Sequence, residues 1–148
     1  MNQGAWVLVV ALVVATAFGL YRATRDGRFR GTHAVRGADQ EQAIPPDHDV
    51  LAGLGHELGE RATLLQFSSA FCAPCRATRR VLADIAAVVP GVRHVEVDAE
   101  HHLDLVRRVG VLRTPTTLVL DGRGQEVTRA SGAPRKEHVL SVLAGIEA

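Results

Sequence analysis

Two cysteines, Cys72 and Cys75, are the residues of this 148-residue sequence whose type and spacing best suit chemistry. They lie between a short β-compatible run and the clearest helical pattern in the chain. At a helix start, unpaired N–H groups and the positive end of the helix dipole stabilise a thiolate on Cys72. Cys75 follows nearly one turn later, within reach of a disulfide. The expected chemistry is thiol–disulfide exchange, in which Cys72 attacks a substrate disulfide and Cys75 resolves the mixed disulfide.

The cysteine pair has two other interpretations. Both cysteines could be inert core residues, although a helix start is an unusual place for these. They could also bind zinc together with His101 and His102, but adjacent histidines rarely face one ion and the second ligand pair of a zinc ribbon is missing. The sequence contains no glycine-rich nucleotide loop and no paired metal ligands, so we expect no cofactor.

Patterns on both sides of the cysteines predict alternating strands and helices. Ala62–Ser68 is β-compatible, and Ala73–Val89 has apolar residues at helical spacing, with Pro74 in its first turn. The later expected elements are a strand at Val92–Val97, a helix at Glu100–Val109 ended by Gly110, strands at Thr116–Leu120 and Gln125–Ala130, and a C-terminal helix opened by Pro134. This order predicts an α/β fold with a mixed central sheet and helices on both faces.

Apolar spacing also predicts which helix residues are buried. One further helix is expected at Asp49–Glu60, although three glycines interrupt it. In the helix at Glu100–Val109, Leu103, Val106 and Val109 share one side. In the C-terminal helix, the residues expected to be buried are Val139, Leu140, Val142, Leu143 and Ile146.

The apolar segment Gly4–Tyr21 predicts a transmembrane anchor, and we expect residues 1–21 to form this part of the chain. Its 18 residues carry no charge and would span about 27 Å as a helix, near the thickness of a bilayer core. Trp6 and Tyr21 stand at its ends, as interfacial anchors would. The alternatives are a buried core helix and a cleaved signal peptide with Ala15–Ala17 as the cleavage site. A signal peptide normally has a basic region before its apolar run, and this chain has none.

Charge is distributed unevenly along the chain. The net charge is +1, which argues against a nucleic-acid binder. Residues 1–40 hold five Arg and two Asp, so the basic excess directly follows the apolar run. The positive-inside rule then predicts an outside N-terminus and a cytoplasmic domain, with an extracytoplasmic domain as the alternative. Residues 22–46 are polar and are expected to be a basic linker, and residues 47–148 the globular domain.

With these elements placed, the stretch Thr63–Val142 resembles a thioredoxin-family domain. The resemblance rests on LLQFSSAFCAPCRATRRVL, on VEVDAE and on RVGVLRTPTTLVLDGRGQEV followed by ASG and the last helix. It implies a cis peptide bond at Pro115 beside the cysteines, where the residues alone equally allow a trans proline at a strand start. It also implies that the substrate-binding residues are Phe71, Ala73, Pro74, Thr114 and Pro115.

The sequence departs from the family pattern at three places. Phe71 stands where the family usually has Trp, and the cysteines enclose Ala-Pro rather than Gly-Pro. Gln66 stands where the family often has a buried Asp that accepts the proton of the resolving thiol, and an amide cannot accept a proton at neutral pH. His94 occupies the place of an accompanying lysine. It is either an alternative proton acceptor or a partly exposed strand histidine.

The resemblance implies a protein-disulfide reductase, and the apolar segment Gly4–Tyr21, which the resemblance does not cover, adds the expectation that it is membrane-tethered. Its partners would be protein disulfide substrates, an unidentified thiol electron donor and, through residues 4–21, the lipid bilayer. One alternative is an extracytoplasmic reductase or isomerase of the type that acts on apocytochromes or secreted proteins. The other is a binding module that uses the fold without turnover.

Overall fold

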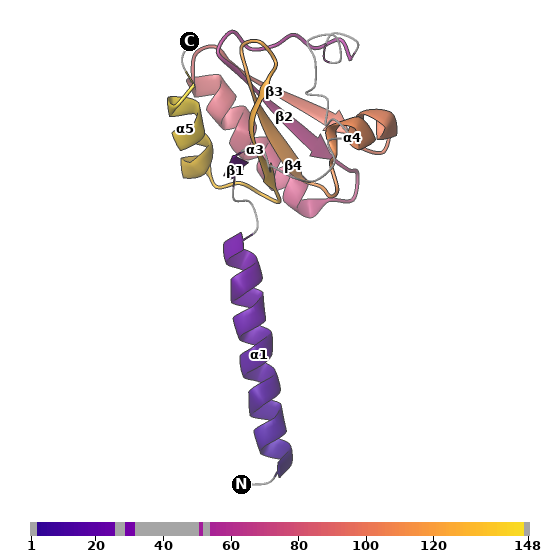
Figure 1. Ribbon diagram of the computed structural model, residues 1–148, viewed down its shortest axis with the longest axis vertical. Coiled ribbons are helices and arrows are strands. Elements are labelled where there is room, and N and C mark those ends of the chain that lie inside the picture. Colours follow the sequence, from indigo (N-terminus) through magenta and orange to yellow (C-terminus); the bar gives the residue numbers. More distant parts are fainter. Residues whose placement is uncertain (1–2, 26–28, 32–50, 52–53, 147–148) are drawn as a thin grey trace, which may run out of the picture.

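The computed structural model describes residues 3–25, 29–31, 51 and 54–146. Helix α1 (Gln3–Arg25) projects from a domain built on one sheet (Figure 1). In chain order the elements are β1 (Phe29–Gly31), β2 (Ala62–Ser68), α3 (Ala73–Val88), β3 (Val92–Asp98), α4 (Leu103–Val109), β4 (Thr116–Asp121), β5 (Glu126–Ser131) and α5 (Lys136–Ala144). The predicted alternation of strands and helices is therefore confirmed.

The sheet has five strands in the order β1-β5-β4-β2-β3. Strands β2 and β3 are parallel because α3 connects them, whereas β4 and β5 form an antiparallel hairpin through the turn at Asp121–Gly124. In that turn, the Asp121 carboxylate accepts hydrogen bonds from the backbone N–H groups of Arg123 and Gln125, both at 2.9 Å. The predicted mixed sheet is confirmed.

Each face of the sheet buries its own apolar core, because successive strand residues point to opposite faces. On one face, Leu65 and Phe67 of β2 pack with Leu105 and Val109 of α4. On the other face, Leu64 packs with residues of α3 and α5, among them Leu82, Ile85, Val139 and Leu143. Figure 1 shows the same arrangement, with α3 and α5 on one side of the sheet and α4 on the other.

Strand β1 was not expected, because it falls within the segment predicted to be a linker. Its three residues pair antiparallel with β5, with Phe29 opposite Ala130 and Gly31 opposite Thr128. A strand this short carries no detectable alternation in the sequence. It forms because β5 would otherwise leave a row of unpaired backbone groups at the edge of the sheet.

Some boundaries and burial predictions were wrong. Residues 54–60 are not helical, although Leu51 is fully buried and Leu54 packs on the same core; residues 49, 50, 52 and 53 lie outside the described part of the chain. Helix α4 starts at Leu103, which is exposed, and not at Glu100. Helix α5 starts after Pro134, and its Leu140 is 37% exposed. In each case the apolar pattern was too short to determine where a helix begins and which of its residues face the core.

The expected end of α4 is confirmed. Gly110 follows Val109 in the left-handed conformation, with φ 69°, and its N–H donates to the carbonyl of Arg107. Glycine adopts this conformation without the steric cost that a Cβ would add. The turn directs the chain toward the loop that precedes β4.

Candidate redox site at the start of α3

Cys72 and Cys75 form a disulfide at the junction of β2 and α3. Their sulfurs are 2.04 Å apart and their Cα atoms 5.2 Å apart. Cys72 has extended backbone angles and is the N-cap of α3, while Cys75 lies in its first turn. The Cys75 N–H donates to the Cys72 sulfur at 3.2 Å. A sulfur at position 72 thus receives one of the free N–H groups at the helix start, as the sequence predicted.

The two cysteines differ in exposure. Cys72 is partly exposed, whereas Cys75 is buried, with 1% of its surface accessible. Ala73 and Pro74 between them are exposed, and Phe71 is 97% exposed. A substrate sulfur approaching from solvent can therefore reach Cys72 directly, while Cys75 is shielded behind it.

The loop before β4 lies against the loop that follows β2. The Thr114–Pro115 peptide bond is cis, as the resemblance implied. The hydroxyls of Ser69 and Thr114 are 3.3 Å apart, so the two loops are in contact. Pro115 is buried and Thr114 is partly exposed. The sequence analysis missed Ser69, because nothing in the sequence indicated which residue joins the loops.

Gln66 lies fully buried beneath the cysteine pair and links it to β3. Its Nε2 donates to the carbonyl oxygen of Cys75 at 3.0 Å, and its Oε1 lies 3.2 Å from His94 Nε2. A carbonyl oxygen only accepts, so the amide nitrogen must face Cys75 and the amide oxygen must face His94. His94 therefore donates from Nε2–H. Gln66 holds the backbone of Cys75 in place without an ionisable group.

His94 is half-buried on β3, between groups of opposite charge. Burial lowers the pKa of His94 below its ordinary value of 6.5, while the nearby Glu96 carboxylate raises it and Arg79 lowers it. The neutral form is therefore favoured at neutral pH, in agreement with the Nε2–H donor role. The structure places His94 on the strand as a half-buried histidine that is hydrogen-bonded to Gln66.

Arg79 of α3 forms an ion pair with Glu96 of β3, with 3.0 Å between Arg79 Nε and Glu96 Oε2. The other Glu96 oxygen accepts a hydrogen bond from the Ser68 hydroxyl at the end of β2. Because Glu96 balances the Arg79 charge, this pair ties α3 to β2 and β3 more than it makes the site basic.

Metal binding has no support in the part of the chain that the structure describes. No group of three or more His, Cys, Asp and Glu residues there is arranged to hold an ion. His101, a candidate ligand in the zinc interpretation, instead contacts Asp98, with 2.9 Å between Nδ1 and Oδ2. Both cysteines are in the disulfide.

Comparisons with known proteins agree with this architecture. The family model described as thioredoxin matches residues 56–145. Thioredoxin H-type 1 of Nicotiana tabacum is 31% identical over 78 residues, which cover 53% of this chain and 61% of the tobacco protein. Thioredoxin of Chlamydia trachomatis is 30% identical over 80 residues, covering 54% of this chain and 78% of that protein.

Solved structures show the same fold. Thioredoxin NaTrxh from Nicotiana alata has a TM-score of 0.53 and 28% identity, covering 60% of this chain and 76% of that one. Fasciola hepatica thioredoxin has a TM-score of 0.56 and 23% identity, covering 70% of this chain and 97% of that one. Because the family model covers more than half of the chain and includes both cysteines, the chain belongs to the thioredoxin family.

Proposed function

We propose that this chain is a membrane-tethered thiol–disulfide oxidoreductase that reduces protein disulfides through Cys72 and Cys75. The observation that carries the proposal is the asymmetry of the pair: Cys72 is accessible at the N-cap of α3, and Cys75 is buried one turn behind it. Membership of the thioredoxin family and the names of its relatives support the same chemistry. Thr114 and Pro115, with Phe71, Ala73 and Pro74, would form the surface that receives the substrate.

The reaction transfers two electrons to the substrate. The Cys72 thiolate attacks one sulfur of a substrate disulfide, which forms a mixed disulfide and releases one substrate thiolate. Cys75 then loses its proton and attacks the Cys72 sulfur, which releases the second substrate thiolate. The two protons of the cysteine thiols end on the substrate thiols, and Cys72–Cys75 is left as the disulfide. A thiol electron donor must reduce that disulfide before the next cycle.

Stabilisation of charge at Cys72 explains the order of the two steps. The N–H of Cys75 and the N-terminal end of a 16-residue helix both face the Cys72 sulfur. A hydrogen bond to a charged group contributes about 1.5–3 kcal/mol, so the thiolate forms there more readily than in free cysteine. Cys75 is buried and becomes reactive only after the mixed disulfide has formed beside it.

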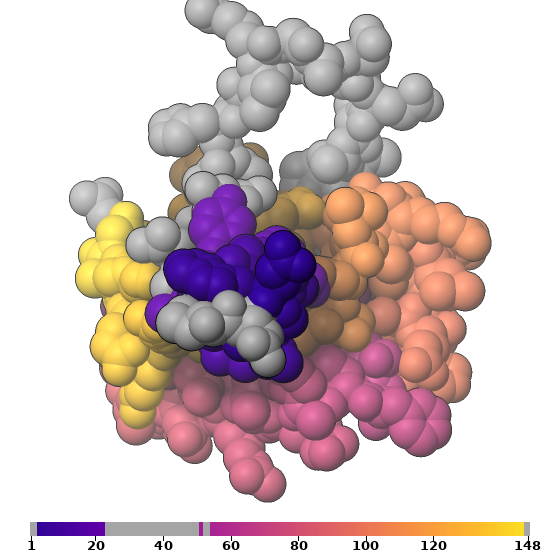
Figure 2. All heavy atoms as spheres, turned by 90° about the horizontal axis from the view of Figure 1, so that it is seen from below, coloured from indigo at the N-terminus to yellow at the C-terminus, as the bar shows by residue number. Residues whose placement is uncertain are grey.

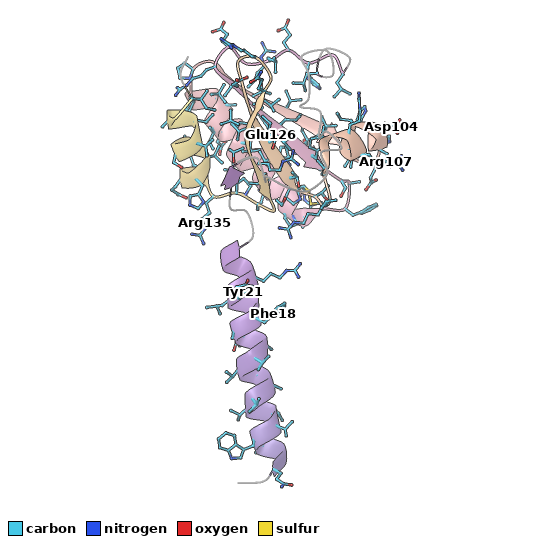
Figure 3. All side chains as sticks on the ribbon, in the orientation of Figure 1. Phe18, Tyr21, Asp104, Arg107, Glu126 and Arg135 are labelled. Atoms are coloured by element: carbon cyan, nitrogen blue, oxygen red, sulfur yellow. A yellow bond between two sulfur atoms is a disulfide. The ribbon has the colours of Figure 1, made fainter. Side chains whose placement is uncertain are left out.

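Residues 4–21 would tether this domain to a bilayer. The apolar segment Gln3–Arg22 is long and hydrophobic enough to cross a membrane, and none of it is buried against the domain. That finding is against the core-helix interpretation, but a signal sequence near an N-terminus would look the same. Figure 3 shows Phe18 and Tyr21 among the outward-pointing side chains of α1. The basic residues that follow favour a cytoplasmic domain, with an extracytoplasmic domain as the alternative.

The proposal is tested with the full chain in detergent or vesicles, because β1 (Phe29–Gly31) lies outside residues 47–148, the predicted globular domain. Insulin reduction with a chemical thiol as donor is expected for the wild type. Cys72→Ser is expected to abolish it, and Cys75→Ser should accumulate mixed disulfides. Equal rates for wild type and Cys72→Ser would exclude catalysis by the pair.

Topology needs its own experiment. A reporter fused to the C-terminus, active only in the cytoplasm or only after export, shows on which side the domain lies. Cytoplasmic activity supports a reductant maintained by the cytosolic thiol pool. Activity only after export supports the extracytoplasmic alternative. Shortening of the chain at residues 15–17 would show a cleaved signal instead of an anchor.

A further inference from the structure

The connection between α1 and the sheet is short. Helix α1 ends at Arg25 and β1 begins at Phe29, so three residues separate them. Four Cα–Cα steps span at most about 14 Å. If α1 crosses a bilayer, the first residue of β1 therefore lies close to the membrane surface, and the edge of the sheet is held there with it.

The register of the strands shows which end of the sheet this is. Phe29 of β1 lies opposite Ala130 of β5, Ala130 opposite Thr117 of β4, and Thr117 opposite Gln66 of β2. Three successive antiparallel pairings make β1 run opposite to β2. Phe29, the start of β1, is therefore level with Gln66, two residues before β2 ends at Ser68.

The redox site lies at this same end, which we call the disulfide end of the sheet. The end of β2 leads to Cys72, and Thr114–Pro115 directly precedes β4. The contact between Ser69 and Thr114 joins the two loops there. At the far end of the sheet, Ala62 pairs with Asp121, next to the β4–β5 turn. The seven residues of β2 run from one end to the other, a distance of about 20 Å.

The figures agree with the register. In Figure 1, β1 lies at the side of the domain nearest to α1, and the arrow of β2 points toward that side. Figure 2 views the molecule from below, with α1 in front of the domain, and the segments coloured for residues near 70 and near 105 are on the visible face.

We propose that the disulfide end of the domain faces the bilayer, and that the substrates are membrane-protein disulfides within about 20 Å of the membrane surface. This inference rests on the membrane tether of the proposed function. A short tether fixed through a strand orients the domain as well as concentrating it, which a flexible linker would not do. Disulfides far from the surface would face the β4–β5 turn instead of Cys72.

Orientation can be measured without activity. In a Cys72→Ser/Cys75→Ser full chain, which has no other cysteine, Leu112→Cys and Arg123→Cys each provide one exposed labelling site. Leu112 is at the disulfide end, two residues before Thr114, and Arg123 is in the far turn. In vesicles with an acceptor dye in the headgroups, energy transfer is expected to be higher from position 112. Equal or higher transfer from position 123 would overturn the orientation, and failure of the chain to float with vesicles would overturn the tether.

Substrate preference is tested with two membrane-anchored peptides of the same sequence, with a disulfide either beside the transmembrane segment or beyond a rigid spacer of about 50 Å. The wild type is expected to reduce the near disulfide at least about tenfold faster. A flexible twelve-residue Gly/Ser insertion between residues 26 and 27 should remove this preference and leave insulin reduction unchanged. No preference in a wild type that reduces insulin would overturn the inference alone. Failure to reduce insulin would overturn the proposed function, and the energy-transfer result would still decide the orientation.

Discussion

The buried contact between Gln66 and His94 offers a quantitative test of how the site is held. Gln66→Leu keeps the approximate volume of the side chain and removes both of its hydrogen bonds, to the Cys75 carbonyl and to His94. The Cys75 carbonyl is in the first turn of α3, where the helix supplies another donor, so no buried acceptor is left without a partner. At about 1 kcal/mol for each lost bond, we expect the free energy of unfolding to fall by about 2 kcal/mol. For a domain of this size, that equals a decrease in Tm of roughly 8–16 °C.

A double-mutant cycle isolates the part that depends on His94. Gln66→Leu, His94→Leu and the double variant are compared in the oxidised state, by thermal unfolding followed with far-UV circular dichroism. Tryptophan fluorescence would not report on the domain, because the only tryptophan, Trp6, lies in α1. The coupling energy between the two side chains is expected to be about 1 kcal/mol.

Thr117→Val is the matched control. Thr117 is opposite Gln66 in the register, equally buried, and its hydroxyl has no hydrogen-bond partner among the described residues. Replacing this hydroxyl by a methyl should leave stability unchanged or raise it. If Gln66→Leu were as stable as the wild type, or if the effects of Gln66→Leu and His94→Leu simply added, the hydrogen bonds that we assign to Gln66 would not hold the site.

Three further predictions follow from burial, charge and backbone contact. Because folding lowers the pKa of His94, the unfolded chain binds a proton there more readily than the folded chain. The free energy of unfolding should therefore decline as the pH falls below about 6.5 and then level off. Urea unfolding at several pH values should show that His94→Leu removes this part of the decline. Leu82→Ala should lower the free energy of unfolding by about 2–5 kcal/mol because Leu82 of α3 is fully buried in the core between the sheet and the helices. Leu112→Ala, at a position that is 96% exposed, should change the unfolding midpoint little. Gly59→Ala should destabilise the domain by about 1–3 kcal/mol, because the added Cβ would lie 2.2 Å from the Ala62 carbonyl oxygen. Gly19→Ala in α1, where an added Cβ would have nothing within 4 Å, is the control. Equal melting curves for Gly59→Ala and the wild type would contradict the close contact.

The sequence predicted those parts of the site that depend on local structure. Pro74 at the helix start, the apolar spacing that includes Leu82 and Ile85, and the run Ala62–Ser68 were enough to place the cysteines between β2 and α3. Once the helix start is placed, helix geometry puts Cys72 at the N-cap and Cys75, three residues later, on the same side of the helix. The accessible Cys72 and the buried Cys75 could therefore be expected before the fold was known.

Short or interrupted patterns were less informative. The helix expected at Asp49–Glu60 is absent from residues 54–60, and Leu103 and Leu140 are exposed although each fits an apolar spacing. A pattern of one or two turns fits several helix phases, and packing against the sheet selects among them.

The chain's own residue types determined that it has a reactive cysteine pair at a helix start, an apolar N-terminal segment and alternating strands and helices. Only the tertiary structure decided that Gln66 joins Cys75 to His94, that Ser69 meets Thr114, and that β1 adds to the edge of the sheet. Gln66 and Cys75 are nine residues apart, and the other contacts connect segments 28 to about 100 residues apart, which strand register brings together. Periodicity reports only which face a residue occupies. Only the assembled sheet determines which residues meet, and that the start of β1, which follows α1, lies toward the same end of the sheet as the disulfide.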